Sequence, residues 1–179
     1  MKTPAATPVT TSIPRGPVLI SLAIGAAILI GFRGQIAEVA AAGGGRPHLP
    51  DLALIGRQGL AIQAHLLAAL TAFLLSLFML GGAKGTRVHK AVGWAWVVLM
   101  MTTALSSFLI TSLNPGRLSW IHILSGWTAF ATPLGVWAAR THRIGLHRRT
   151  MTGLVVGGLL IAGGLTFIPG RLMWRVFFG

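Results

Sequence analysis

Apolar residues along the chain gather in five runs, separated by short polar or glycine- and proline-rich segments. Most of these runs approach or exceed the ~20 residues that a helix needs to cross the ~30 Å hydrocarbon core of a bilayer. Because the links between them are short, we expect one all-α integral membrane bundle, with its last four helices forming a central antiparallel bundle. The pattern predicts membrane spans at about 18–32, 59–80, 92–113, 118–139 and 151–168.

The segments between the runs contain residues that end helices. Glycines 43–45 with Pro47 and Pro50 predict a loop after the first run, and the Asn-Pro-Gly sequence at 114–116 predicts a turn after the third. We therefore divide the chain into a flexible N-terminal tail (1–17), a transmembrane helical domain (18–170) and an interfacial C-terminal tail (171–179).

The first run, 18–32, is the shortest and has a second interpretation. It could be a signal peptide, with Lys2 and Arg15 as its basic region and alanines 40–42 as a cleavage site. Arg33 separates the apolar run from that site, whereas cleavage normally follows the apolar region closely. A membrane span is therefore the favoured interpretation.

Composition supports a membrane protein, because 54% of the residues are hydrophobic and only 9% are charged. Fifteen Lys and Arg stand against two acidic residues, which gives a net charge of +13. These cations lie between apolar runs, so we expect them to face the lipid bilayer and not nucleic acid.

The cations are unevenly shared between the loops. The loop between the third and fourth spans holds Arg117 alone, whereas its two neighbours hold Lys84, Arg87, Lys90, Arg140, Arg143, Arg148 and Arg149. By the positive-inside rule we expect those two loops and the N-terminus to be cytoplasmic in a multi-pass protein.

Several kinds of chemistry are excluded by residues that the chain lacks. With no cysteine it cannot form disulfides, iron–sulfur clusters, thiolate-ligated haem or the covalent haem attachment of c-type cytochromes. Its two acids, Glu38 and Asp51, lie outside the apolar runs, so they offer neither a carboxylate pair for hydrolysis nor an intramembrane proton relay. Histidine remains as the ligand for a soft metal, and no catalytic residue is assigned.

Four of the six histidines fall at two levels of the predicted bundle, whereas His48 and His142 lie in loops and are expected to be solvated. In an antiparallel bundle, helices of the same direction lie diagonally opposite, so each level offers two imidazoles across the axis. A haem with two axial histidines requires that arrangement. The outer level holds His65 and His122, and the inner level holds His89 and His147.

Residues around these histidines allow more than one interpretation. Small side chains on the same helix faces could make room for a flat ligand, but close packing of helices is favoured: Ala68, Ala69, Ala72, Ser76, Ser125, Gly126, Ala129 and Pro133. Cations near each level could pair with haem propionates, although the positive-inside rule already explains the inner ones: Arg57, Arg117, Lys90, Arg148 and Arg149.

Tryptophans and hydroxyl residues in the spans are assigned structural roles. Most of the tryptophans lie near span ends and are expected to form an interfacial belt: Trp94, Trp96, Trp120, Trp127 and Trp137. The hydroxyls of the third span are expected to hydrogen-bond within or between helices: Thr102, Thr103, Ser106 and Ser107.

Three stretches, IHILSGWT (121–128), HRRTMTGL (147–154) and GGLLIAGGLTFIPGR (157–171), resemble a family of predicted bacterial integral membrane proteins of unknown function. The likeness runs from about Gln63 to the C-terminus. It implies a location in the inner (plasma) membrane of a bacterium, but it carries no activity.

The order of the histidines is also similar to that of the transmembrane di-haem cytochromes b of the five-sixty-one type, whose ligands come from four successive helices. That resemblance implies that His65 and His122 hold an outer b haem, and that His89 and His147 hold an inner one. Such proteins pass electrons across the membrane, from donors such as ascorbate or quinol. This chain departs from them in lacking an acid–base group that would mark a substrate pocket at either face.

The leading hypothesis is therefore an integral membrane electron-transfer protein with two b haems, whose expected partner is quinone or another redox protein. One alternative is a non-catalytic accessory or assembly protein with its histidines as interfacial anchors. A small-solute transporter is a third, and it is the least supported because the spans lack intramembrane charges and paired broken helices.

Overall fold

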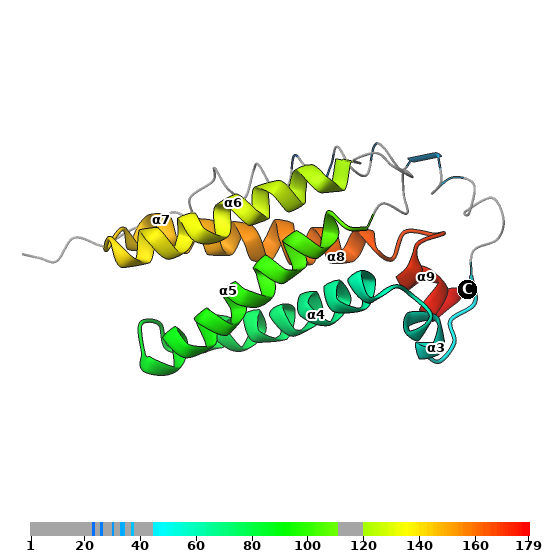
Figure 1. Cartoon of the computed structure of the whole chain (residues 1–179), viewed down its shortest axis with the longest axis horizontal. Helices are drawn as coiled ribbons and strands as arrows, with labels where there is room; N and C mark the ends of the chain where they lie inside the picture. Colours follow the sequence, from blue (N-terminus) through cyan, green and yellow to red (C-terminus); the bar gives the residue numbers. More distant parts are fainter. Residues whose placement is uncertain are drawn as a thin grey trace, which may run out of the picture.

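The computed structural model describes residues 45–110 and 120–179, together with six single helical positions between 23 and 37. Within these residues every regular element is a helix, which confirms the all-α class (Figure 1). The first predicted span, 18–32, lies outside the described residues except for Ala23, Ala26 and Ile30, which are helical.

Four long helical segments alternate in direction along the molecule (Figure 1). Each packs on the next along the chain, and the π-helical part of the fourth also contacts the first and third, so the segments form a closed ring. As a result the first and third segments lie diagonally opposite. The segments are α4 (Leu60–Gly81), α5 (Arg87–Ser107), α6 (Trp120–Arg140) and a fourth made of α7 (Ile144–Gly153), the π-helix η1 (Leu154–Ile161) and α8 (Ala162–Leu165).

Two helices of the described part, α4 and α5, are long and apolar enough to cross a membrane. Only 17% and 22% of their most apolar windows are buried inside the molecule. A core helix of a soluble protein would be mostly buried, so the exposed apolar surface of these two helices suits a lipid environment.

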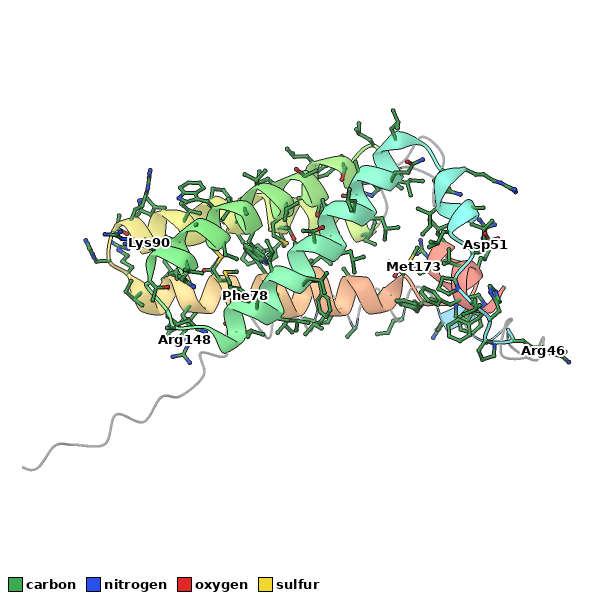
Figure 2. The ribbon with its side chains drawn as sticks, turned by 90° about the horizontal axis from the view of Figure 1, so that it is seen from below. Arg46, Asp51, Phe78, Lys90, Arg148 and Met173 are labelled. Carbon is green, nitrogen blue, oxygen red and sulfur yellow. The ribbon has the colours of Figure 1, made fainter. Side chains whose placement is uncertain are left out.

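Both ends of the ring carry cations, but the one acidic residue of the described part lies at one end only. Lys90 and Arg148 lie at the end without it, which we call the basic end, and Asp51 and Arg46 lie at the other (Figure 2). There, two short helices pack on each other, α3 (Leu52–Gly56) and α9 (Leu172–Phe178). Asp51 caps α3 by accepting a hydrogen bond from the Ala53 amide at 3.0 Å, and its own amide donates to the Val176 carbonyl at 3.0 Å. The predicted interfacial tail, 171–179, thus consists mostly of helix α9, which packs against α3.

The predicted third span, 92–113, is shifted from the helix observed. Helix α5 begins at Arg87, because the hydroxyl of Thr86 accepts a hydrogen bond from the His89 amide at 3.1 Å and caps the helix. It ends at Ser107, after which the amide of Leu109 donates to the carbonyl of Ser106, three residues earlier, at 3.0 Å, and the α-helical ladder stops. Residues 111–113 lie outside the described part of the chain.

The predicted fifth span, 151–168, also begins too late and ends too late. Its helical segment starts at Ile144. Arg148 and Arg149, which are predicted to lie in a loop, instead lie in the amphipathic helix α7, with their charged side chains exposed. The segment ends at Leu165, where the hydroxyl of Thr166 bonds to the Gly163 carbonyl at 2.6 Å.

The core of the ring lies at its middle and is built around Trp96, which is 2% exposed. Its indole nitrogen donates to the Ser76 hydroxyl at 2.8 Å, so the polar edge of the ring is paired. The prediction that Trp96 belongs to an interfacial belt is therefore wrong, whereas Trp94 and Trp137 are 52% and 45% exposed. The apolar side chains of the core cluster are Ala72, Trp96, Met100, Ala131, Leu154 and Leu159.

Candidate functional site

His65 lies in the second turn of α4 and is held by the neighbouring helix α5. Its Nδ1 is 2.9 Å from the carbonyl oxygen of Thr103 and 3.1 Å from the hydroxyl of Ser106. A carbonyl only accepts hydrogen bonds, so Nδ1 must carry the proton. In the neutral imidazole the lone pair then resides on Nε2, which is the form that a metal-binding histidine takes.

His122 lies near the start of α6 and is 4% exposed. The ring of Phe108 packs against it, with 5.8 Å between the ring centroids and 42° between the planes. One turn further along α6, Ser125 receives a short hydrogen bond from the hydroxyl of Ser107. This bond joins α6 to α5 at the level where α5 also holds His65.

Together these residues form a buried or half-buried group at the α3–α9 end of the ring, which we call the outer polar cluster: His65, Thr103, Ser106, Ser107, His122 and Ser125. The two predicted outer histidines come from diagonal helices, and α5 lies between them and supplies hydroxyls to both sides. The structure therefore places both outer histidines at one level, where His65 bonds to α5 and His122 packs against Phe108 at the end of α5.

His147 lies in the first turn of α7, at the basic end. Its Nδ1 is 2.9 Å from the carbonyl oxygen of Gly135 on α6, so this imidazole also carries its proton on Nδ1. A Cβ at Gly135 would lie 2.5 Å from the Cε of Met151. A side chain at position 135 would therefore displace the end of the Met151 side chain where α7 packs on α6.

His89 lies at the start of α5 and is half-buried. It is within electrostatic range of His147 and of Lys84, so the structure brings the two predicted inner histidines into one neighbourhood. This neighbourhood differs from the outer polar cluster, because the residues next to it along the chain, Lys90 and Arg148, are exposed cations.

The remaining two histidines are exposed, as predicted. His48 bonds through its ring to the carbonyls of Leu49 and Gly179, at 2.7 and 3.1 Å, and so fastens the C-terminus. His142 occupies a turn with a φ of 57°. Neither lies at one of the two levels.

Sequence reasoning missed several residues that shape these levels. Phe108 was not singled out, and Ser76 was noted only as a small side chain. The pairing of Ser107 with Ser125 was also missed, although Ser125 lies three residues after His122 and therefore on the same helix face. That spacing was the available signal, but only the packing of α5 against α6 identifies the partner.

The described side chains at the two levels do not by themselves complete a metal site. Within residues 45–110 and 120–179, no three histidine or acidic side chains gather as a metal site. Each level instead offers two histidines, as haem requires of its axial ligands. Exposed arginines lie near both levels, Arg57 at one end and Arg148 and Arg149 at the other, whereas Arg117 lies outside the described residues.

Comparison with protein-family models, with curated proteins and with solved structures finds no match to this chain.

Proposed function

We propose that the chain is an integral membrane electron-transfer protein that binds two b-type haems. His65 and His122 would hold the haem of the outer level, and His89 and His147 the haem of the inner level. Each haem supplies, when bound, an iron that takes up and releases one electron. We further propose a multi-pass location in a bacterial inner membrane, with five spans and the basic end facing the cytoplasm.

One observation carries this proposal: at each level, one imidazole donates its Nδ1 proton to a backbone carbonyl of the adjacent helix. His65 bonds to Thr103 at 2.9 Å, and His147 bonds to Gly135 at 2.9 Å. Such a bond fixes the ring orientation, selects the tautomer with Nε2 unprotonated and raises the basicity of the ligand. The same arrangement occurs at opposite ends of the molecule, on different helices.

The core between the levels supports two separate sites rather than one. Trp96, Met100 and Leu154 are all 2% exposed or less and fill the middle of the ring. A single large cofactor therefore has no room to extend through the centre. Instead, each pair of histidines acts at its own end, and the apolar core keeps water from the space between them.

The electron donor and acceptor would approach the two ends, and we propose quinone or a redox protein for this role. The basic end carries exposed cations, among them Arg148 and Arg149, which would pair with propionates or with an acidic partner surface.

Absorption spectroscopy of detergent-purified protein, expressed with ample haem, tests the proposal. The expected result is a Soret band and a sharp reduced α-band, with about two haems per chain. His65→Ala and His122→Ala should remove one spectral component, and His89→Ala and His147→Ala the other. His48→Ala and His142→Ala are the matched controls and should remove neither.

Colourless protein would contradict the proposal, and so would loss of one shared component in His65→Ala and His89→Ala. The accessory-protein alternative would then lead. It is favoured by the same interhelical bonds, because the contacts of His65 with Thr103 and of Ser107 with Ser125 also stabilise helix packing in a membrane.

A further inference from the structure

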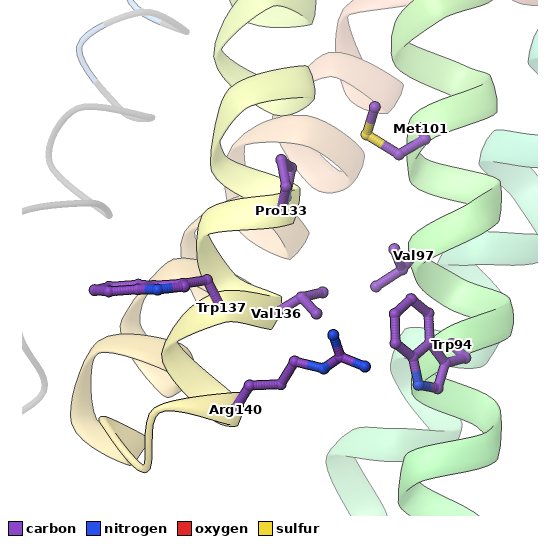
Figure 3. Close-up of a pocket in the computed structure, with 7 residues that line it drawn as sticks. All are labelled: Trp94, Val97, Met101, Pro133, Val136, Trp137 and Arg140. Atoms are coloured by element: carbon purple, nitrogen blue, oxygen red, sulfur yellow. The ribbon is translucent and has the colours of Figure 1, made fainter.

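An open groove runs along the outside of the molecule between α5 and α6, toward the basic end (Figure 3). Its volume is about 360 Å³. The wall from α5 is formed by Trp94, Val97 and Met101, and the wall from α6 by Pro133, Val136, Trp137 and Arg140. Both sets follow helical spacing, so the groove extends parallel to the two helices for about 10 Å, the rise of seven residues.

Pro133 forms part of the groove wall. It lies inside α6, where proline cannot donate the hydrogen bond to the carbonyl four residues earlier, so the local backbone ladder lacks one bond. The described residues leave the outer side of the groove open.

Among the described residues, the only charged one in the lining is Arg140, which lies at the mouth of the groove and is the last residue of α6. Its guanidinium carbon is 5.8 Å from the centroid of the Trp94 ring, across the groove (Figure 3). Trp94 is exposed to about half, as interfacial tryptophans are. The ring of Trp137 points away from Arg140 (Figure 3) and lies 4.8 Å from the guanidinium carbon of Arg143. The described lining of the groove therefore combines an apolar length with a cationic mouth.

No acidic residue of the described part of the chain lies at this end. Asp51 is at the α3–α9 end, where it caps a helix (Figure 2), and Glu38 lies outside the described residues. The basic end therefore attracts anions, and the groove mouth combines that attraction with a guanidinium, which binds phosphate through two parallel hydrogen bonds.

We propose that this groove binds one anionic phospholipid, with the phosphate on Arg140 and one acyl chain along the apolar walls. A phospholipid fits both parts of the groove, because its charge and its hydrocarbon are joined at one end. This inference rests on the membrane placement proposed above and is independent of the haems. With the basic end cytoplasmic, the lipid would come from the leaflet that carries anionic headgroups.

The test uses full-length protein in detergent with an equimolar mixture of phosphatidylglycerol and phosphatidylcholine, and native mass spectrometry counts the retained lipids. Wild-type protein should retain one phosphatidylglycerol in preference to phosphatidylcholine. Arg140→Gln should lower that preference about fivefold, as expected for one cation near a membrane surface. Arg149→Gln removes the same charge from the same end outside the groove and should keep the preference.

Val136→Trp fills the groove without changing its charge and should reduce the retention of both lipids. Circular dichroism should show unchanged helix content in all three variants, since Arg140 and Arg149 are exposed and Val136 is half-buried. The groove would be excluded as a lipid site by equal retention of the two lipids in wild type, by equal loss in Arg140→Gln and Arg149→Gln, or by full retention in Val136→Trp.

A further contrary outcome is that a short-chain quinone displaces the lipid from wild-type protein and binds the Arg140→Gln variant equally well. That result would overturn the inference and assign the groove to quinone. A colourless protein that selects phosphatidylglycerol through Arg140 would contradict the haem proposal and support this one, so the two proposals fail separately.

Discussion

The two ends of the molecule hold histidine in contrasting surroundings. At the α3–α9 end, His65 bonds to the hydroxyl of Ser106, and a hydrogen bond between the hydroxyls of Ser107 and Ser125 lies one turn along α6 from the buried His122. At the basic end, the two histidines open their helices and have exposed cations as neighbours in the chain. The spacing of the four histidines in the sequence makes them equivalent, but their surroundings in the folded chain differ.

Because of this difference, removing a histidine should have unequal effects on ligand binding and on the stability of the fold. Removing His65 breaks an interhelical hydrogen bond at a part-buried position, where a polar group left unpaired is costly, and removing His147 breaks the matching bond to Gly135. Around His89, water and neighbouring charges can compensate for the lost imidazole. Both His65→Ala and His89→Ala should impair ligand binding, but His65→Ala should also lower the free energy of unfolding by more than His89→Ala does.

The contrast also predicts that the two ends face opposite sides of a membrane, which labelling tests as an all-or-none effect. The chain has no cysteine, so a single one can be introduced without background. Arg57→Cys lies exposed before α4, and Thr141→Cys lies exposed in the turn after α6. A membrane-impermeant maleimide added to intact cells should label the first and spare the second, because basic loops resist translocation.

Lysed cells provide the control, since both positions should then react. Reversed labelling would turn the bundle over but keep its two levels. Labelling of both positions in intact cells would mean that the two ends are not separated by a membrane.

The core that separates the ends should show the next largest effect. Trp96→Ala removes a buried ring and its bond to Ser76, and it should lower the free energy of unfolding by about 3 kcal/mol. Trp94→Ala is the matched control, because Trp94 is 52% exposed and its loss should cost well under half as much. Titration with a denaturing detergent, followed by circular dichroism, measures both. Equal losses would show that Trp96 does not hold the core.

Much of the helical framework could be predicted from the length of the apolar runs. Both bounds of α4 and the last residue of α6 lie within one residue of the predicted spans, and the alternation of helix direction places His65 with His122 and His89 with His147. Those inferences need only the order of elements along the chain. The same reasoning assigned solvated positions to His48 and His142, both of which are exposed.

What could not be predicted depends on contacts between helices. Trp94 and Trp96 are two residues apart and point about 200° from each other around α5, so one faces the core and the other the surroundings. The sequence placed both near a span end, because it did not reveal that the Thr86 cap starts α5 at Arg87. The π-helix at Leu154–Ile161 was likewise hidden, since its composition is that of any apolar helix.

The smallest expected effect lies in the outer polar cluster and tests whether its hydroxyls stabilise that end. Ser107→Ala and Ser125→Ala each remove one partner of a buried hydrogen bond between α5 and α6. Interhelical hydrogen bonds in membranes contribute about 0.6 kcal/mol on average, so a double-mutant cycle should give a coupling of that size. Thr141→Ala is the control at the basic end, because its exposed hydroxyl bonds only within its own turn, to Trp137 at 3.0 Å and to Ala138 at 3.4 Å, and its loss should be close to neutral. A coupling indistinguishable from zero would mean that the two ends do not differ in how polar groups hold the helices together.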